Sequence, residues 1–327
     1  MTAKPRLSVV LPTYNCAPLI GRHVASMAKW AALADEIIVV DSRSTDGTLD
    51  LIRAGLRHPN LRIIERDRGL YDSWNEGIAA TAGEWVYVST VGDLISEEHL
   101  RRLMREGERA DVDVVVSPQR FVAEDGAPYQ GSDFANAEIH DILAGQGVVV
   151  LTPAAVCYFA FRRAKPNALL GSWASDLFRG DFLRARPLPT VYGTHGDTAW
   201  TLRHSSEMKL CLVPVAGADF CIHEKTSGGA PTPLSQLLGR MFVEESARLR
   251  GKHAGVPAEY YALHILSERT NAAARRRREL SRGTPICPPD RLAWIPAALR
   301  YLYLRLRLGL AESSMERKVR KGIRQHG

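Results

Sequence analysis

The sequence of 327 residues lacks the features typical of membrane-spanning and secreted proteins. No uncharged apolar run reaches about 18 residues, the length that a membrane-spanning helix needs. The apolar segment near the N-terminus is too short and wrongly flanked for a signal peptide. The five cysteines are an odd number without a CxxC pair, which offers neither a disulfide framework nor zinc-ligand spacing. We therefore expect a cytoplasmic protein with reduced thiols.

Two kinds of nucleotide motif and an evenly spread positive charge are also missing. Neither G-x-G-x-x-G nor G-x-x-x-x-G-K-[ST] occurs. Residues 275–327 hold 14 Lys/Arg and 4 Asp/Glu, a net of +10, which leaves 29 basic and 32 acidic side chains elsewhere. The nearly neutral body argues against nucleic acid as a partner. The basic C-terminal region predicts contact with something anionic.

Apolar, β-branched runs alternate with helix-compatible segments in the first third of the chain. This alternation predicts an α/β fold with a parallel sheet covered on both faces. The expected strands are 7–11, 36–40, 61–65, 85–89 and 112–117. The expected helices are 17–30, 48–55, 71–81 and 97–108.

Polar residues follow each of the first four expected strands. These stretches are 12–15, 41–48, 66–69 and 90–93. Any one of them is compatible with a helix cap or a turn. Parallel α/β sheets, however, bind ligands at the carboxyl ends of their strands. Four polar stretches on one rim therefore predict a binding site there.

Four segments, read in order, carry a resemblance to a known family. "SVVLPTYN", "EIIVVDSRSTDGT", "RGLYDSWNEGIAATAGEW" and "STVGD" resemble family 2 glycosyltransferases with the GT-A fold, above all bacterial members that build exopolysaccharide, capsule or O-antigen. The resemblance implies a Rossmann-like, mostly parallel sheet flanked by helices. It also implies a nucleotide-sugar half at 1–125, an acceptor-binding and catalytic half at 126–270, and a basic helical extension at 271–327.

The implied reaction is inverting transfer of a sugar from a nucleotide-sugar donor, with a UDP-sugar favoured, to a saccharide or polyprenyl-linked acceptor. In such enzymes the last Asp of "STVGD" holds Mg²⁺ or Mn²⁺ against the donor diphosphate, which assigns metal binding to Asp93. Thr90 and Gly92 stand where many relatives carry Asp, so one carboxylate replaces two or three. His223, in "FCIHEKTSGG", is a second candidate metal ligand, and phosphate binding is its alternative role.

The resemblance places further donor-binding residues on the same rim. Asp41 matches the carboxylate that accepts a hydrogen bond from the base of the nucleotide. The remaining candidates for donor binding are Pro12, Tyr14, Asn15, Arg68, Asp72, Asn75, Thr90 and Gly92.

The second half of the chain has to supply a base and an acceptor site. "THGDTAWTLRHSSEMKL" resembles the region of the family that carries the catalytic carboxylate, which assigns the base to Asp197. Gly-Asp-Thr before an apolar run also fits a helix start, and the two roles are compatible. Asp176 is the alternative carboxylate, and Trp173 is a candidate platform for stacking a sugar.

The stretch 288–310 combines Trp294, aliphatic residues and arginines. It resembles an interfacial helix on an anionic bilayer, which predicts a peripheral protein on the inner face of the bacterial cell membrane. A packing helix with snorkelling arginines would have the same composition.

Two other functions share part of this sequence pattern. A non-catalytic nucleotide-sugar-binding component of a polysaccharide assembly complex would explain the thinned acidic motif, but it would have no reason to keep both Asp93 and Asp197. A sugar-1-phosphate nucleotidyltransferase should carry a glycine-rich loop after the first strand, where this chain has Pro-Thr-Tyr-Asn.

Overall fold

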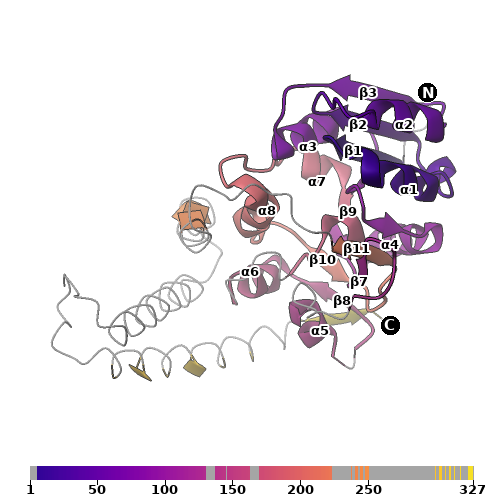
Figure 1. The fold of residues 1–327 in the computed structure, drawn as a ribbon. Helices are drawn as coiled ribbons and strands as arrows, with labels where there is room; N and C mark the ends of the chain where they lie inside the picture. Colours follow the sequence, from indigo (N-terminus) through magenta and orange to yellow (C-terminus); the bar gives the residue numbers. More distant parts are fainter. Residues whose placement is uncertain are drawn as a thin grey trace, which may run out of the picture.

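A computed structural model describes residues 6–129, 137–144, 146–162 and 169–222, together with scattered positions between 237 and 326. All structural statements below concern these residues. Within them the chain forms a central sheet with helices on both faces and a smaller sheet beside it (Figure 1).

The first four strands form the parallel part of the central sheet. They are β1 (Leu7–Thr13), β2 (Glu36–Asp41), β3 (Leu61–Glu65) and β4 (Trp85–Val88). β1 lies between β4 and β2, and β3 follows β2. Every residue of β2 and β4 is buried, as the continuous Val/Ile runs predict for strands covered on both faces.

Two groups of helices cover the two faces of this sheet (Figure 1). α1 (Ala17–Met27), α2 (Thr48–Gly55) and α4 (Glu97–Ala110) contribute to one apolar core. α3 (Leu70–Ala79), α6 (Pro153–Arg162), α7 (Gly180–Arg184) and α8 (Gly196–His204) contribute to the other. The predicted two-sided covering is confirmed.

The fifth predicted strand does not extend the parallel row. β6 (Val114–Val116) is separated from β4 by β9 (Asp176–Arg179), which runs antiparallel to both. The sheet is therefore mixed. The prediction missed β9 because it has only four residues and begins with an aspartate. Because β9 runs antiparallel, its first residue, Asp176, lies at the end of the sheet where β4 and β6 finish.

The remaining strands complete the described fold. β8 (Val148–Leu151), β10 (Leu210–Leu212) and β12 (Arg324–His326) extend the central sheet, and β8 is antiparallel to both neighbours. β5 (Leu94–Ile95), β7 (Gln119–Ala123) and β11 (Ala218–Ile222) form the smaller sheet. The short elements are α5 (Ala137–Leu143), η1 (Ala31–Leu33), η2 (Trp173–Ser175) and η3 (Gly193–His195).

The predicted division at residues 125 and 270 stays a prediction. Strands from both sides of residue 125 share the central sheet, and most of 271–327 lies outside the described residues. In the part of the chain that the structure describes, no helix has both the length and the hydropathy needed to cross a membrane.

Candidate functional site

Asp41 is fixed at the carboxyl end of β2. It is fully buried and lies opposite Thr13 of β1, whose hydroxyl donates a hydrogen bond of 2.7 Å to Asp41 Oδ1. The backbone amide and the hydroxyl of Ser44 donate to Asp41 Oδ2 and Oδ1, each at 2.7 Å. Three donors therefore orient one carboxylate at the rim, and the sequence reading did not identify Thr13 as one of them.

The loops after β1 and β2 are tied together by side chains. The Asn15 side-chain oxygen accepts from the Thr45 amide at 2.9 Å, and the Asn15 amide donates to Ser44 Oγ at 2.9 Å. Asn15 and Arg43 have positive φ angles of 42° and 54°, an uncommon conformation for residues other than glycine. Backbone held in this region by several hydrogen bonds is typical of a binding loop.

Exposed side chains line the rim beside Asp41. The Arg68 guanidinium lies 4.5 Å from the centroid of the Tyr14 ring, and Tyr14 is 40% exposed. Asp72 is exposed in the first turn of α3, and Pro12 is half-buried near the end of β1. An aromatic ring and a cation therefore lie together at the exposed rim, and their predicted contact with a nucleotide stays a prediction.

The turn after β4 explains why Gly92 occupies its position. The Asp93 amide donates to the Thr90 carbonyl at 3.0 Å, which closes a tight turn. Gly92 has a φ of 98°, a conformation that L-residues rarely adopt. An aspartate at this position would be strained, so the turn geometry accounts for the missing carboxylate at Gly92.

The carboxylate of Asp93 is buried, at 4% exposed. The Cys221 amide donates to Oδ1 at 2.9 Å, and the Ser172 hydroxyl lies 3.4 Å from Oδ2. Burial raises the pKa of Asp93 to about 7, and the charge of Asp219 adds to this effect, whereas the two hydrogen bonds oppose it. A bound cation would offset the cost of holding the ionised carboxylate here.

The described residues supply only part of a metal site. No group of three or more His, Cys, Asp or Glu side chains suited to an ion occurs among them. His223 lies outside the described residues, directly after β11. Asp93 fits a divalent cation as a hard oxygen ligand, and the other ligands would have to come from elsewhere.

Asp197 lies in the first turn of α8 and is half-buried. Its Oδ1 accepts a hydrogen bond of 2.6 Å from the Thr198 amide. The charge of Asp197 is one cause, after burial, of the raised pKa of the Tyr71 hydroxyl, so the phenol stays protonated beside it. No sequence pattern singles out Tyr71, although it lies in the segment "RGLYDSWNEG".

Asp176 is fully buried at the start of β9. The Ser175 hydroxyl lies 3.3 Å from Oδ1, and Oδ2 has no hydrogen-bond partner among the described residues. Burial first, and then the charge of Asp197, raise the pKa of Asp176 well above its ordinary value. The two carboxylates are therefore close enough to influence each other.

Trp173 lies in an aromatic cluster and is 3% exposed. Its ring centroid is 4.2 Å from Phe178, 5.4 Å from Trp74 and 5.1 Å from Trp200. The ring is packed on protein in this structure, and its predicted stacking on a sugar stays a prediction.

Asn75, a predicted donor-binding residue, instead bonds through its side chain to the backbone of Leu188.

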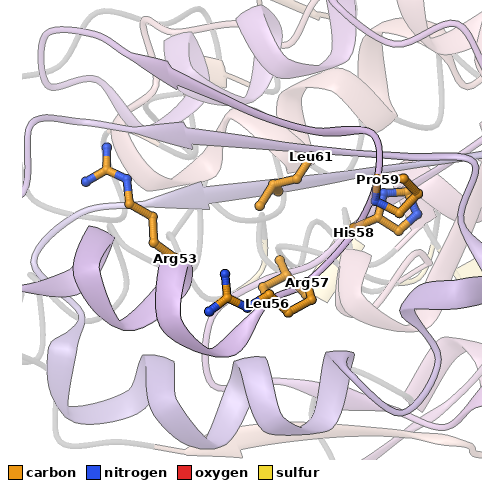
Figure 2. Close-up of a pocket in the computed structure, with 6 residues that line it drawn as sticks. All are labelled: Arg53, Leu56, Arg57, His58, Pro59 and Leu61. Atoms are coloured by element: carbon orange, nitrogen blue, oxygen red, sulfur yellow. The ribbon is translucent and has the colours of Figure 1, made fainter.

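A pocket of about 560 Å³ lies away from this rim (Figure 2). It occupies the end of α2 and the loop leading into β3, at the amino end of that strand, whereas Asp41 lies at the carboxyl end of β2. It is lined by Arg53, Leu56, Arg57, His58, Pro59 and Leu61. None of the predicted site residues belongs to it.

Comparisons with known proteins find related sequences and structures. Residues 8–169 match the profile of "Glycosyl transferase family 2". The chain is 32% identical to the succinoglycan biosynthesis protein ExoO of Rhizobium meliloti over 124 residues, 37% of this chain and 35% of that protein. It is 34% identical to a PGL/p-HBAD biosynthesis glycosyltransferase of Mycobacterium bovis over 100 residues, 29% of this chain and 38% of that protein. The matched segments thus span little more than a third of these relatives.

Solved structures of S. aureus TarS residues 1–349 share the fold. The structure in complex with UDP has a TM-score of 0.57 at 16% identity, covering 97% of this chain and 92% of that chain. The structure in complex with UDP-GlcNAc has a TM-score of 0.54 at 17% identity, covering 98% and 93%. The family match, which covers all four rim segments, identifies residues 8–169 as a glycosyl transferase family 2 region.

Proposed function

We propose that this protein is an inverting glycosyltransferase that moves a sugar from a UDP-sugar to a saccharide or lipid-linked acceptor during cell-surface polysaccharide or glycolipid synthesis. The family match supports the reaction class. The relatives named for succinoglycan and PGL/p-HBAD biosynthesis support the product class. The UDP and UDP-GlcNAc complexes of TarS support the donor class.

The observation that carries the proposal is the placement of two oriented carboxylates on either side of β1. Asp41 ends β2, Asp93 follows β4, and both strands pair with β1. Ligands of parallel α/β sheets bind at this end. We assign the nucleotide base to Asp41 and the diphosphate to the region of Asp93.

The other rim residues would complete donor binding. Tyr14, held beneath Arg68, would flank the base, and Pro12 and Asn15 would shape the loop around it. Arg68 and Asp72 would lie near the diphosphate and sugar, with Thr90 and Gly92 in the turn that presents Asp93. A donor contact from Asn75 stays a prediction, because its amide is already bonded to Leu188.

Asp93 and His223 would hold Mg²⁺ or Mn²⁺. When bound, the ion would offset the negative charge of the departing diphosphate. The chain itself favours ion binding through Asp93, because an ionised carboxylate in a buried position lacks a compensating charge among its described partners.

Asp197 would act as the base. It would remove the proton from the acceptor hydroxyl as that oxygen attacks the anomeric carbon opposite the leaving diphosphate. Asp176 and Trp173, near Asp197 and the Trp200 ring of α8, would belong to the acceptor side.

The C-terminal extension would hold the enzyme at an anionic membrane. Within it, five described apolar side chains are each more than half exposed. They are Leu299, Leu302, Tyr303, Leu306 and Leu310, and we call them the apolar face. Positions three, four, seven and eleven residues after Leu299 place them along one side of a helix, as expected for an interfacial segment in a basic region. This supports a peripheral location on the inner face of the bacterial cell membrane.

The decisive experiment measures thermal stabilisation of the purified full chain by UDP, GDP and dTDP, and release of each nucleotide from its nucleotide sugar, with and without Mn²⁺. Stabilisation by UDP, together with release of UDP from a UDP-sugar, is the expected result. Binding without release in the presence of acceptor extracts would favour the non-catalytic sugar-nucleotide-binding protein. Neither binding nor release would overturn the proposal.

A further inference from the structure

Two side chains of helix α3 form hydrogen bonds with the backbone of the segment that precedes Asp197. The Asn75 side-chain amide donates to the Leu188 carbonyl at 2.9 Å, and the Leu188 amide donates back to the Asn75 side-chain oxygen at 2.7 Å. Six residues further along, the Tyr71 hydroxyl donates to the Thr194 carbonyl at 3.0 Å. Three hydrogen bonds therefore fix both ends of the segment 188–194, which ends three residues before Asp197.

Tyr71 and Asn75 are one helical turn apart and share a face of α3. They are separated by 123 and 113 residues from their partners, so these bonds connect distant parts of the chain. α3 itself packs against β1 and β2, whose carboxyl ends carry the proposed donor site. One rigid helix therefore contacts both the donor-binding strands and the polypeptide that carries the proposed base.

The Tyr71 ring also packs directly beneath the start of α8. A β-carbon added at Gly196 would lie 2.4 Å from the Tyr71 ring and 2.3 Å from the Pro189 carbonyl oxygen. Real β-carbons essentially never lie within 3.0 Å of a non-bonded heavy atom, so only glycine permits this approach. The residue before Asp197 is thus in close contact with the same tyrosine that bonds to Thr194.

We propose that Tyr71 and Asn75 are positioning residues for Asp197, and that α3 sets the placement of the base relative to the donor site. The inference rests on the proposed function. It assigns a task to two residues of the "RGLYDSWNEG" segment that is separate from donor contact. Loss of the hydrogen bonds of either residue would make the position of Asp197 less fixed, while the donor-binding residues would stay in place.

The test compares Tyr71→Phe and Asn75→Ala with the parent full chain. Tyr71→Phe keeps the ring against Gly196 and removes only the hydroxyl. Asn60→Ala is the matched control, because Asn60 also donates a side-chain hydrogen bond to a backbone carbonyl, that of Asp35 at 2.8 Å, but lies beside the pocket at the opposite end of the sheet. Release of UDP from a UDP-sugar by water serves as the assay, since it needs no known acceptor.

We expect kcat to fall about tenfold or more in both variants, because a misplaced catalytic group can cost up to about 10² in rate. The KM for the donor should stay within about twofold, and the control should match the parent. A rise in KM at constant kcat would make the two residues donor contacts and overturn the inference, as would unchanged kinetics. A parallel fall in melting temperature and in the fraction of active enzyme would show that Tyr71 and Asn75 only stabilise the fold.

If the parent released no UDP from any donor, the proposed function would fail on its own, and amide exchange would then decide the inference. Asn75→Ala should speed exchange at Leu188, whose amide it no longer accepts, and Tyr71→Phe should speed exchange in the first turn of α8. Unchanged protection from amide exchange at both places would show that the hydrogen bonds of Tyr71 and Asn75 do not fix this segment.

Discussion

The backbone amide of Cys221 donates a hydrogen bond of 2.9 Å to the carboxylate of Asp93. This bond joins β11 of the smaller sheet to the turn that follows β4 of the central sheet. It spans 128 residues, and it holds a carboxylate whose pKa burial raises to about 7. Asp93 is thus oriented by the fold before any ligand arrives, at a cost in stability once it ionises.

The raised pKa of Asp93 predicts a specific dependence of stability on pH. The unfolded state loses this proton near pH 4, whereas the folded state keeps it until about pH 7. Between these values the folded state binds more protons, so the contribution of Asp93 to stability falls as pH rises. In metal-free buffer, Asp93→Asn should be more stable than the parent at pH 8 by roughly 1–4 kcal/mol, and no more stable at pH 4.

Denaturant unfolding in EDTA at pH 4, 6 and 8 checks this expectation. Asp50→Asn is the control, because Asp50 lies on the surface of α2 and pairs only weakly with Arg53 at 3.6 Å. It should follow the pH dependence of the parent. An Asp93→Asn variant with the same pH dependence as the parent would mean that folding does not change the pKa of Asp93.

Asp41 should recognise the base of the nucleotide. Asp41→Asn keeps the shape of the side chain but replaces one acceptor oxygen by an NH₂ donor. This donor would face either the groups of Ser44 that now donate to Asp41 or the incoming base. UDP affinity should fall by roughly 1–3 kcal/mol, the scale of losing a hydrogen bond to a charged acceptor. Calorimetry with UDP, GDP and dTDP measures the change.

Glu65→Gln provides the control for Asp41, because Glu65 ends β3 and lies opposite Asp41 in the parallel register. It is exposed and accepts none of the hydrogen bonds that fix Asp41. Its substitution should leave UDP affinity unchanged. Equal affinities of all three nucleotides for Asp41→Asn and the parent would remove Asp41 from the site.

The apolar face of the C-terminal extension should bind anionic membranes. Replacing Leu302 and Leu306 by Glu places two negative charges on a surface that is more than half exposed. Sedimentation of this variant with phosphatidylglycerol vesicles should drop strongly at low salt. Binding of the parent should weaken as salt screens the basic residues.

Leu51→Glu, a change to an exposed leucine on α2, is the control and should bind like the parent. Equal sedimentation of all three proteins would contradict membrane contact through this face.

The local elements of the donor half could be predicted closely from the sequence. The predicted helix 48–55 and strand 61–65 match α2 and β3 residue for residue, because their apolar periodicity and flanking turns are local signals. The predicted helix 71–81 begins one residue late and ends two residues late relative to α3. The rim position of Asp41 also followed from its place at the carboxyl end of a predicted parallel strand.

The partners of the site residues could not be predicted in the same way. Ser172 and Cys221 lie 79 and 128 residues from Asp93, and no local pattern encodes such pairings. The insertion of β9 is equally non-local, and it is what carries Asp176 to the rim. For Tyr71 a signal did exist, since it stands in a recognised motif, but its task depends on the fold around residue 194.

The last prediction separates the two candidate bases. Asp197→Asn should lower turnover by about 10²–10⁴ and leave donor affinity nearly intact, because a general base acts on the acceptor and not on the bound nucleotide. Asp176 is fully buried, and burial followed by the charge of Asp197 raises its pKa, so replacing it by a neutral amide should cost less than the same change at Asp197. Asp176→Asn should therefore retain most of the turnover, with its main effect on the KM for the acceptor. Steady-state kinetics with saturating donor distinguish the variants. If Asp197→Asn keeps full turnover while Asp176→Asn loses it, then Asp176 is the base despite its burial, and α3 positions a residue that only supports it.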